Sequence, residues 1–249
     1  MTIIFQNSTL MVNAISLFAS LSPFMKLYSS EGKVIFYSLD RGELACGILE
    51  LNLQGIKQSY VYKISPLVTV FKNLKEIVFH LENDGTLLVS GKIRGRNVIT
   101  KLEPIEVEYP LAPLSLLKDY HLITVADSSD VLKILNLFKT KDIEEIAFCI
   151  KNCTLEIEGI GYGIKLLCKI PLKNAVIRSS KFMIPSPYFR LMNFISKSSQ
   201  KLYVYKLHEG PILISSESVK VKKDKLLLIV SAREGEQRNP IRDIKEESS

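Results

Sequence analysis

The feature that most constrains the fold is an internal repeat of roughly 120 residues. Leu17-Phe18 aligns with Leu137-Phe138 at an offset of 120, and Gly85–Ser90 aligns with Gly210–Ser215 at an offset of 125. The second copy therefore has five additional residues between these blocks, which we expect in its second helix. Because a repeat of this length corresponds to a whole domain, the sequence predicts two similar domains.

Both copies show the same order of secondary-structure signals. Each begins with a capped segment that has apolar residues at helical spacing, continues with strand-like runs bounded by turn residues, and then has a second helix with proline in its first turn. The expected helices are Ser8–Leu21, Pro66–Leu74, Ser128–Lys139 and Pro187–Lys197. The expected strands include Lys26–Ser30, Lys33–Leu39, Leu44–Asn52, Ser59–Ile64 and Asn97–Ile105, then Glu145–Lys151, Thr154–Glu158, Ile164–Ile170, Ala175–Ile184 and Lys225–Ala232.

These signals predict an α+β fold in which each domain packs two helices on antiparallel sheets. The first domain is expected over residues 1–105 and the second over residues 119–233. Residues 106–118 contain Pro110 and Pro113 and are expected to form an extended connector. From residue 234 the sequence is polar and charged, so a disordered tail is expected there.

The composition indicates a folded intracellular protein. Lys and Arg number 33 against 26 Asp and Glu, and the net charge of +7 favours a polyanionic partner or an acidic membrane surface. Apolar runs such as Leu226–Val230 are much shorter than the roughly 20 residues of a membrane-spanning helix, and Met1–Leu10 lacks signal-peptide features. Buried, reduced thiols are expected at Cys46, Cys149, Cys153 and Cys168.

Each expected helix carries one narrow polar stripe, with steps of three and four residues that place it on a single face. No acidic residue occurs in the stripes, whereas a solvated helix usually carries both signs of charge. Hydroxyls, amides and sparse basic residues can contact phosphate oxygens without reading bases, so we predict a nucleic-acid backbone opposite them. Ordinary solvated faces are the alternative. The stripes are Thr9, Asn13, Ser16 and Ser20; Ser129, Lys133, Asn136 and Thr140; Ser186, Arg190, Asn193 and Lys197; and Thr69, Lys72 and Asn73.

The repeat, the connector and three local segments together resemble the DNA sliding clamps of the proliferating cell nuclear antigen (PCNA) family, most of all its crenarchaeal members. The segments are Tyr37–Leu44, Lys63–Val78 and the ending Leu228–Arg233. The resemblance extends over roughly residues 2–233. It implies a pseudo-sixfold ring of three subunits whose helices line a central hole for duplex DNA, and a protein that is not an enzyme. The DNA-facing residues would be Lys72, Lys133, Arg190, Lys197, Asn13 and Asn193, with Lys75, Lys139 and Lys201 at helix ends.

The resemblance also implies a pocket under the connector that takes apolar side chains of partner peptides. Apolar anchors beside an extended strand suit such recognition, although Leu39 and Ile229 also fit simple core packing. Ser231-Ala232 stands where the family usually has Ala-Pro. The matching positions are Leu39, Leu111, Leu114, Leu116, Pro211, Ile229, Ser231 and Ala232.

Ring closure in the family joins an edge strand of one subunit's first domain to an edge strand of the next subunit's second domain. Here those edges are expected near Asn97–Ile105 and Ala175–Phe182. The expected partners are double-stranded DNA without sequence preference, two identical or related clamp subunits, and a DNA polymerase, ligase, nuclease and clamp loader that bind through short peptides. No membrane partner is expected, and the location is cytoplasmic in an archaeon or nuclear in a eukaryote.

The sequence offers no clear catalytic or metal-binding pattern, and no cofactor is expected. His80, His121 and His208 are far apart, and Cys149 with Cys153 lacks a second ligand pair. Gly159–Gly163 is followed by a predicted strand instead of a helix, so we interpret it as a turn and not a dinucleotide loop. The alternatives are a checkpoint-type or specialised heterotrimeric clamp subunit, a nucleic-acid-processing enzyme, and a protein-interaction scaffold that forms no ring.

Overall fold

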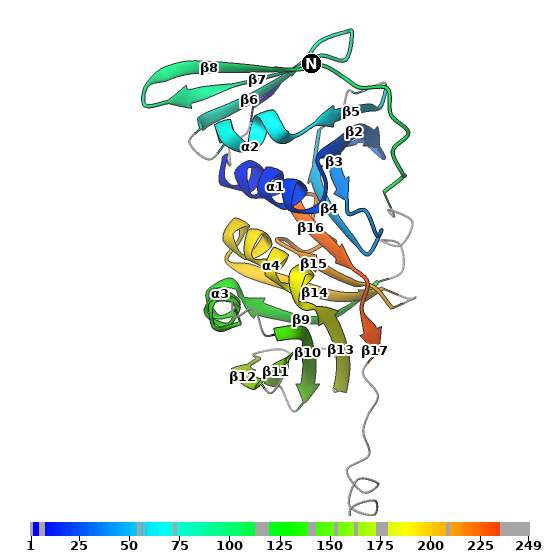
Figure 1. The fold of residues 1–249 in the computed structure, drawn as a ribbon, viewed down its shortest axis with the longest axis vertical. Helices are drawn as coiled ribbons and strands as arrows, with labels where there is room; N and C mark the ends of the chain where they lie inside the picture. The colour runs from blue at the N-terminus through cyan, green and yellow to red at the C-terminus, as the bar shows by residue number, and fades with distance from the viewer. Residues whose placement is uncertain are drawn as a thin grey trace, which may run out of the picture.

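A computed structural model describes residues 2–4, 8–53, 56, 58–71, 74–112, 120–138, 143–151, 154–161, 164–172, 179–207 and 210–234. Within them the chain forms three antiparallel sheets (Figure 1). The first contains β1 (Thr2–Ile4), β6 (Lys75–Leu81), β7 (Leu87–Ile93) and β8 (Arg96–Leu102), in that order. The second contains β12 (Ile164–Pro171), β11 (Thr154–Gly161), β10 (Ile143–Lys151), β13 (Ser179–Pro185) and β17 (Arg233–Glu234).

The third sheet has eight strands and runs through both repeats. Its order is β5 (Tyr60–Lys63), β2 (Phe24–Ser30), β3 (Lys33–Leu39), β4 (Ala45–Leu51), β16 (Lys225–Val230), β15 (Ile212–Ser215), β14 (Lys201–Leu207) and β9 (Tyr120–Asp127). The antiparallel pair formed by β4 and β16 is the place where the repeats meet. We call this pair and the helices packed on it the internal junction.

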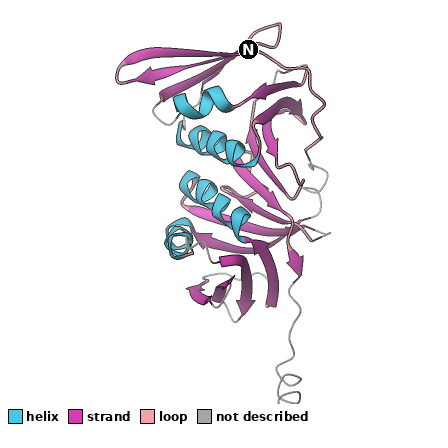
Figure 2. Cartoon of the chain, in the orientation of Figure 1, coloured by secondary structure: helices cyan, strands magenta, loops and turns pink. Residues whose placement is uncertain are grey.

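The helices of the described chain lie in one row along one side of the eight-stranded sheet (Figure 2). They are α1 (Ser8–Leu21), α2 (Ser65–Phe71), α3 (Ser128–Leu137) and α4 (Ser186–Ser198). Contacts join α2 to α1, α1 to α4 and α4 to α3, so the row passes from one repeat to the other without a break. As expected, the second helix of the second copy is the longer one, with 13 residues against 7.

Apolar side chains form a core on each face of the eight-stranded sheet. The main core packs α1 and α4 against the inner face, with Leu17, Phe36 and Ile195 among its fully buried members. A smaller outer cluster covers the opposite face of the same sheet. Its buried members are Ile35, Tyr37, Cys46, Ile48, Tyr205, Leu213, Leu227 and Ile229. Strands buried on both faces explain why β4 and β16 are almost continuously apolar in sequence.

The observed elements confirm the predicted α+β fold with helices packed on antiparallel sheets. Helix α1 and strand β3 have the expected bounds, whereas α2 ends at Phe71, before the predicted Leu74. Gly159–Gly161 belongs to β11, so the predicted turn there was wrong over these residues. A Cβ at Gly159 would lie 2.9 Å from Ile143, which explains the glycine by close packing. Glu234, placed in the tail by the sequence, pairs with Phe182 through β17.

Strands β8 and β12 lie at opposite ends of the molecule, and each is the outermost strand at one side of its sheet (Figure 1). Strand β8 pairs only with β7 and β12 pairs only with β11 among the described residues. The β8 edge agrees with the predicted Asn97–Ile105. The second prediction was wrong for the described part of Ala175–Phe182, because β13 lies inside its sheet between β10 and β17. Periodicity shows that β10, β11 and β12 are strands but does not show which end of this meander remains unpaired.

Candidate nucleic-acid interface

The outward side of the helix row is the candidate interface. Each helix buries apolar residues in the main core, and the row lies on one side of the eight-stranded sheet (Figure 1). The row contains residues from both repeats at the positions where the sequence predicted stripes. Which of these side chains reach solvent differs from helix to helix.

Helix α4 presents the clearest polar face. Arg190 and Lys197 are exposed and Asn193 is partly exposed, at the three- and four-residue spacing of one helix side. The opposite side is held in the core by residues such as Phe189 and Met192. Two basic groups therefore stand along one helix on the outward side of the row.

Helix α3 adds Lys133, whose side chain is 75% exposed. Its ammonium lies 2.9 Å from the carboxylate of Asp130, one turn earlier. The expectation that no acidic residue lies along these faces was therefore wrong for α3. An exposed pair of this kind contributes little to stability, so Lys133 remains able to exchange Asp130 for a phosphate.

Helix α1 departs from the prediction at Asn13, which is only 8% exposed. Its amide donates a 3.1 Å hydrogen bond to the Ser198 hydroxyl of α4. The hydroxyls of Ser16 and Ser20 donate to backbone carbonyls four residues earlier. Spacing placed Asn13 on a polar stripe, but the packing of α1 on α4 turns it into a link between the repeats, which the sequence of one helix cannot reveal.

The remaining predicted DNA-facing residues are less informative. Thr69 of α2 is exposed, whereas Lys72 lies outside the described residues, as do Thr140 and Lys139. Lys201 is exposed at the start of β14. The described interface therefore consists mainly of Arg190, Asn193, Lys197 and Lys133.

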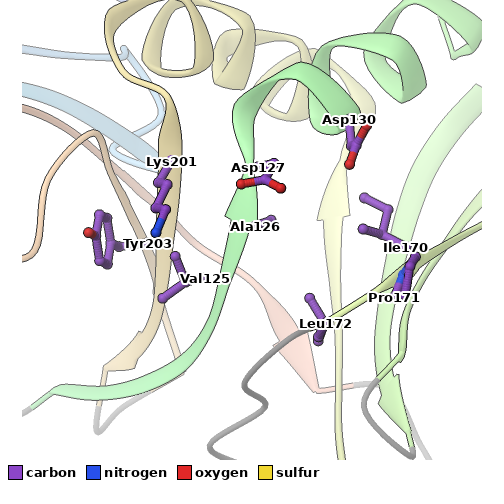
Figure 3. Close-up of a pocket in the computed structure, with 9 residues that line it drawn as sticks. All are labelled: Val125, Ala126, Asp127, Asp130, Ile170, Pro171, Leu172, Lys201 and Tyr203. Carbon is purple, nitrogen blue, oxygen red and sulfur yellow. The ribbon is translucent and has the colours of Figure 1, made fainter.

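Figure 3 shows a hollow of about 240 Å³ between the start of α3, the start of β14 and the end of β12. Its polar side chains include Asp127, Asp130 and Lys201, and Leu172 forms part of its apolar wall. Among the described residues, no group of three or more His, Cys, Asp and Glu side chains is placed to hold a metal ion. The hollow therefore offers charged groups beside the end of β12.

The connector covers part of the outer cluster. Tyr109 and Ala112 pack against it, and the Tyr109 hydroxyl accepts a 2.9 Å hydrogen bond from the Leu39 backbone N–H. The Tyr37 hydroxyl donates to the carbonyl of Pro110, and burial raises the pKa of Tyr37. Two tyrosines therefore hold the connector to the sheet. In the sequence only the leucines of the connector stood out, and these contacts were not predicted.

The predicted peptide-pocket residues fall into three groups. Leu39 and Ile229 belong to or pack on the outer cluster, and Ile229 is only 4% exposed. Leu111 is 82% exposed and Ser231 is exposed, while Pro211 and Ala232 are partly buried. Leu114 and Leu116 lie outside the described residues. Leu39 thus packs on the outer cluster beneath the connector, and Ile229 is buried in its core.

Cys46, Cys149 and Cys168 are free thiols, and burial raises the pKa of Cys46. Cys153 lies outside the described residues. In the described part of the chain, no helix is both long and apolar enough to cross a membrane.

Solved structures share this architecture over almost the whole chain. A chain of the PCNA2–PCNA3 complex of Sulfolobus tokodaii aligns with a TM-score of 0.79 and 8% identity, covering 94% of this chain and 99% of that one. The chain has the fold of PCNA. PCNA of Entamoeba histolytica aligns with a TM-score of 0.73 and 10% identity, covering 93% and 98% of the two chains.

PCNA of Thermococcus kodakaraensis aligns with a TM-score of 0.71 and 12% identity, covering 93% and 99%. No family model and no curated protein matches the sequence. In this PCNA fold the helix row and the connector-covered sheet face are the two surfaces that carry the predicted site residues. At such low identity, the roles of those residues rest on their own chemistry.

Proposed function

We propose that this chain is a subunit of a DNA sliding clamp, a ring of three clamp-fold chains that encircles duplex DNA and tethers replication and repair enzymes. It is a tether and not a catalyst in this proposal. The observation that carries it is the internal junction, because the strands equivalent to its two halves, β8 and β12, are edge strands at opposite ends of the described chain.

The repeat defines this equivalence. Strand β12 has the place in the second copy that β4 has in the first, and β8 has the place of β16. Within the chain β4 pairs with β16, whereas β8 and β12 are edges of the described sheets. Pairing β8 of one chain with β12 of the next would repeat the internal junction between chains. Head-to-tail contacts of this type produce rings when the rotation closes.

Helix α3 carries a second sign of a missing neighbour. Leu17 of α1 is fully buried, and it lies so close to Gly47 of β4 that a Cβ there would be 3.0 Å from it. Its equivalent in the repeat, Leu137 of α3, is 59% exposed. The same position of the repeat is therefore buried in α1, beside the internal junction, and exposed in α3. This is expected if a neighbouring subunit covers Leu137 in the ring.

The helix row supports DNA as the content of the ring. Arg190, Lys197 and Lys133 supply positive charge and Asn193 a neutral amide, without a base-reading motif. Such groups bind phosphates with a strength that depends on salt and not on sequence, which allows movement along DNA. The connector-covered face, with Leu39 beside Tyr109 and exposed Leu111, is the proposed docking place for peptides of a polymerase, ligase, nuclease or clamp loader.

The test replaces Lys133, Arg190 and Lys197 together with alanine. The assembled ring, loaded on closed circular DNA, should then slide off or dissociate faster after linearisation or salt challenge, and the salt dependence of DNA binding should become weaker by about three contacts. The matched control replaces Lys220, Lys222 and Lys223 in the β15–β16 loop, which removes the same charge away from the helices. Equal retention of both variants would contradict the proposal.

A further inference from the structure

The outward faces of the two edge strands differ in charge from the internal junction. In that junction β4 and β16 place Glu50 opposite Lys225, Ile48 opposite Leu227 and Cys46 opposite Ile229. Glu50 and Lys225 are both buried, and Glu50 also accepts a 2.9 Å hydrogen bond from Lys33. Two apolar pairs beside an acid–base pair thus join the repeats.

The edge strands have an apolar centre with lysine beside it. On β8 the exposed residues Asn97, Ile99 and Lys101 share one face, while Val98 packs on the core. On β12 the exposed residues are Lys165, Leu167 and Lys169, while Leu166 and Cys168 pack on the core. Ile99 is 70% exposed and Leu167 is 52% exposed. Neither outward face contains an acidic residue.

The internal junction suggests the register between chains. Placing Ile99 opposite Leu167 reproduces its central apolar pair and keeps the core-facing residues on the same side. Antiparallel pairing then sets Lys101 opposite Lys165 and Asn97 opposite Lys169. The nearby acids Glu103, Glu158 and Glu156 are already bonded to Lys101, Lys165 and Lys169 of their own chain. In this register a second copy places Lys101 opposite Lys165, and each of these nearby acids already has a lysine partner in its own chain.

We propose that the ring neighbours of this chain are different clamp-fold chains whose edge strands carry carboxylates opposite Lys101 on one side and opposite Lys165 and Lys169 on the other. This inference rests on the proposed ring. Directly opposed unlike charges stabilise a strand pair and like charges destabilise it. Like charges placed opposite each other also weaken binding of the wrong partner, so they give specificity more than they add affinity for the right one. Lysine opposite lysine would therefore disfavour pairing with a second copy of this chain.

The test reverses one charge and measures self-association of the full chain by light scattering after gel filtration at micromolar concentration. The unaltered chain should elute as a monomer of 28.2 kDa. Lys165→Glu creates an acid opposite Lys101 of the next copy, and Lys101→Glu creates one opposite Lys165, so each variant alone should form assemblies of about three times that mass. Combining both changes should restore the monomer, because glutamate then faces glutamate. Lys223→Glu, far from both edges, is the matched control and should stay monomeric.

Each outcome decides the inference. A trimer of the unaltered chain would overturn it while leaving the proposed function in place, because a ring would exist. Monomers in every variant would overturn the register on which it depends. Self-association of the single reversals, with return to monomer in the double variant, would support it. A reversed-charge trimer that is not retained on circular DNA would contradict the proposed function and leave the choice of neighbours supported.

Discussion

The internal junction and the two outer edges, β8 and β12, are built from equivalent elements of the repeat. These elements are paired at the junction and have one open side at the edges of the described sheets. At the internal junction β4 pairs with β16, α1 packs on α4, and Leu17 and Lys225 are buried. At the outer edges β12 and β8 have no second neighbour among the described residues, and Leu137 is exposed. The difference shows which strand and helix contacts the chain completes within itself and which sheet edges stay open among the described residues.

The largest expected effect is on Leu17. Leu17→Ala should lower the free energy of unfolding by about 2 to 5 kcal/mol, because it removes a fully buried side chain from the contact between α1 and β4. The same change at its equivalent, Leu137→Ala, should alter the stability of the isolated chain by less than about 0.5 kcal/mol. Urea unfolding of both variants measures the contrast, and comparable losses would contradict the distinction between the two junctions.

An intermediate effect is expected at Lys225. Its ammonium donates to the carbonyls of Ser218, Val219 and Val221 at 3.3, 3.2 and 2.7 Å, and burial lowers its pKa. Lys225→Met keeps much of the volume but leaves these acceptors without their donor, so unfolding should become easier by about 2 kcal/mol. Lys223→Met in the exposed loop is the control, with little change expected. An unchanged denaturation midpoint for Lys225→Met would show that water replaces the ammonium at this end of the junction.

The smallest effect concerns Tyr188 of α4, whose hydroxyl donates a 2.8 Å hydrogen bond to Asp40 across the repeats. Tyr188→Phe should cost about 1 kcal/mol near neutral pH. Burial and the neighbouring Asp40 raise the pKa of Tyr188 to about 12. Because the folded chain holds this proton more tightly than the unfolded chain, the stabilisation is complete below pH 10 and is lost as the pH rises towards 12.

The measurement for Tyr188 is the difference in unfolding free energy between the unaltered chain and the variant from pH 8 to pH 12. Taking the difference removes the shared contribution of other tyrosines with raised pKa, such as Tyr28. Tyr60→Phe, which loses only an exposed hydrogen bond to Gln58, provides the control. A difference that does not change with pH would show that the hydroxyl does not act through Asp40.

The repeat and the hydrophobic periodicity predicted the element order and the fold class well. Strands such as β3 and helix α1 have strong local signals, namely apolar alternation, capping residues and turn pairs, and their bounds agree with the structure. Gly159 was misjudged, because glycine marks a turn and also a close contact, and only the position of Ile143 separates the two.

The candidate site was harder to predict because exposure depends on neighbouring helices. Arg190 and Lys197 are on the outward face as expected, whereas Asn13 has the same spacing and is buried against α4. Lys133 is exposed but forms an ion pair with Asp130. Asp130 lies one turn before Lys133 and had not been counted among the residues of the stripe. The unpaired β12 edge and the exposure of Leu137 could have been suspected from the repeat, but only by knowing which strands pair within the chain.

The sequence by itself determined that this chain is a duplicated α+β protein with polar, partly basic helix faces and an apolar connector region, because these properties follow from local periodicity and from the repeat. Only the tertiary structure decided that β4 takes β16 as its partner while β8 and β12 remain edges, and that Leu17 is buried while Leu137 is not. The physical reason is that strand pairing and burial depend on contacts between residues far apart in the chain, and equivalent sequences meet different neighbours at the middle and at the ends.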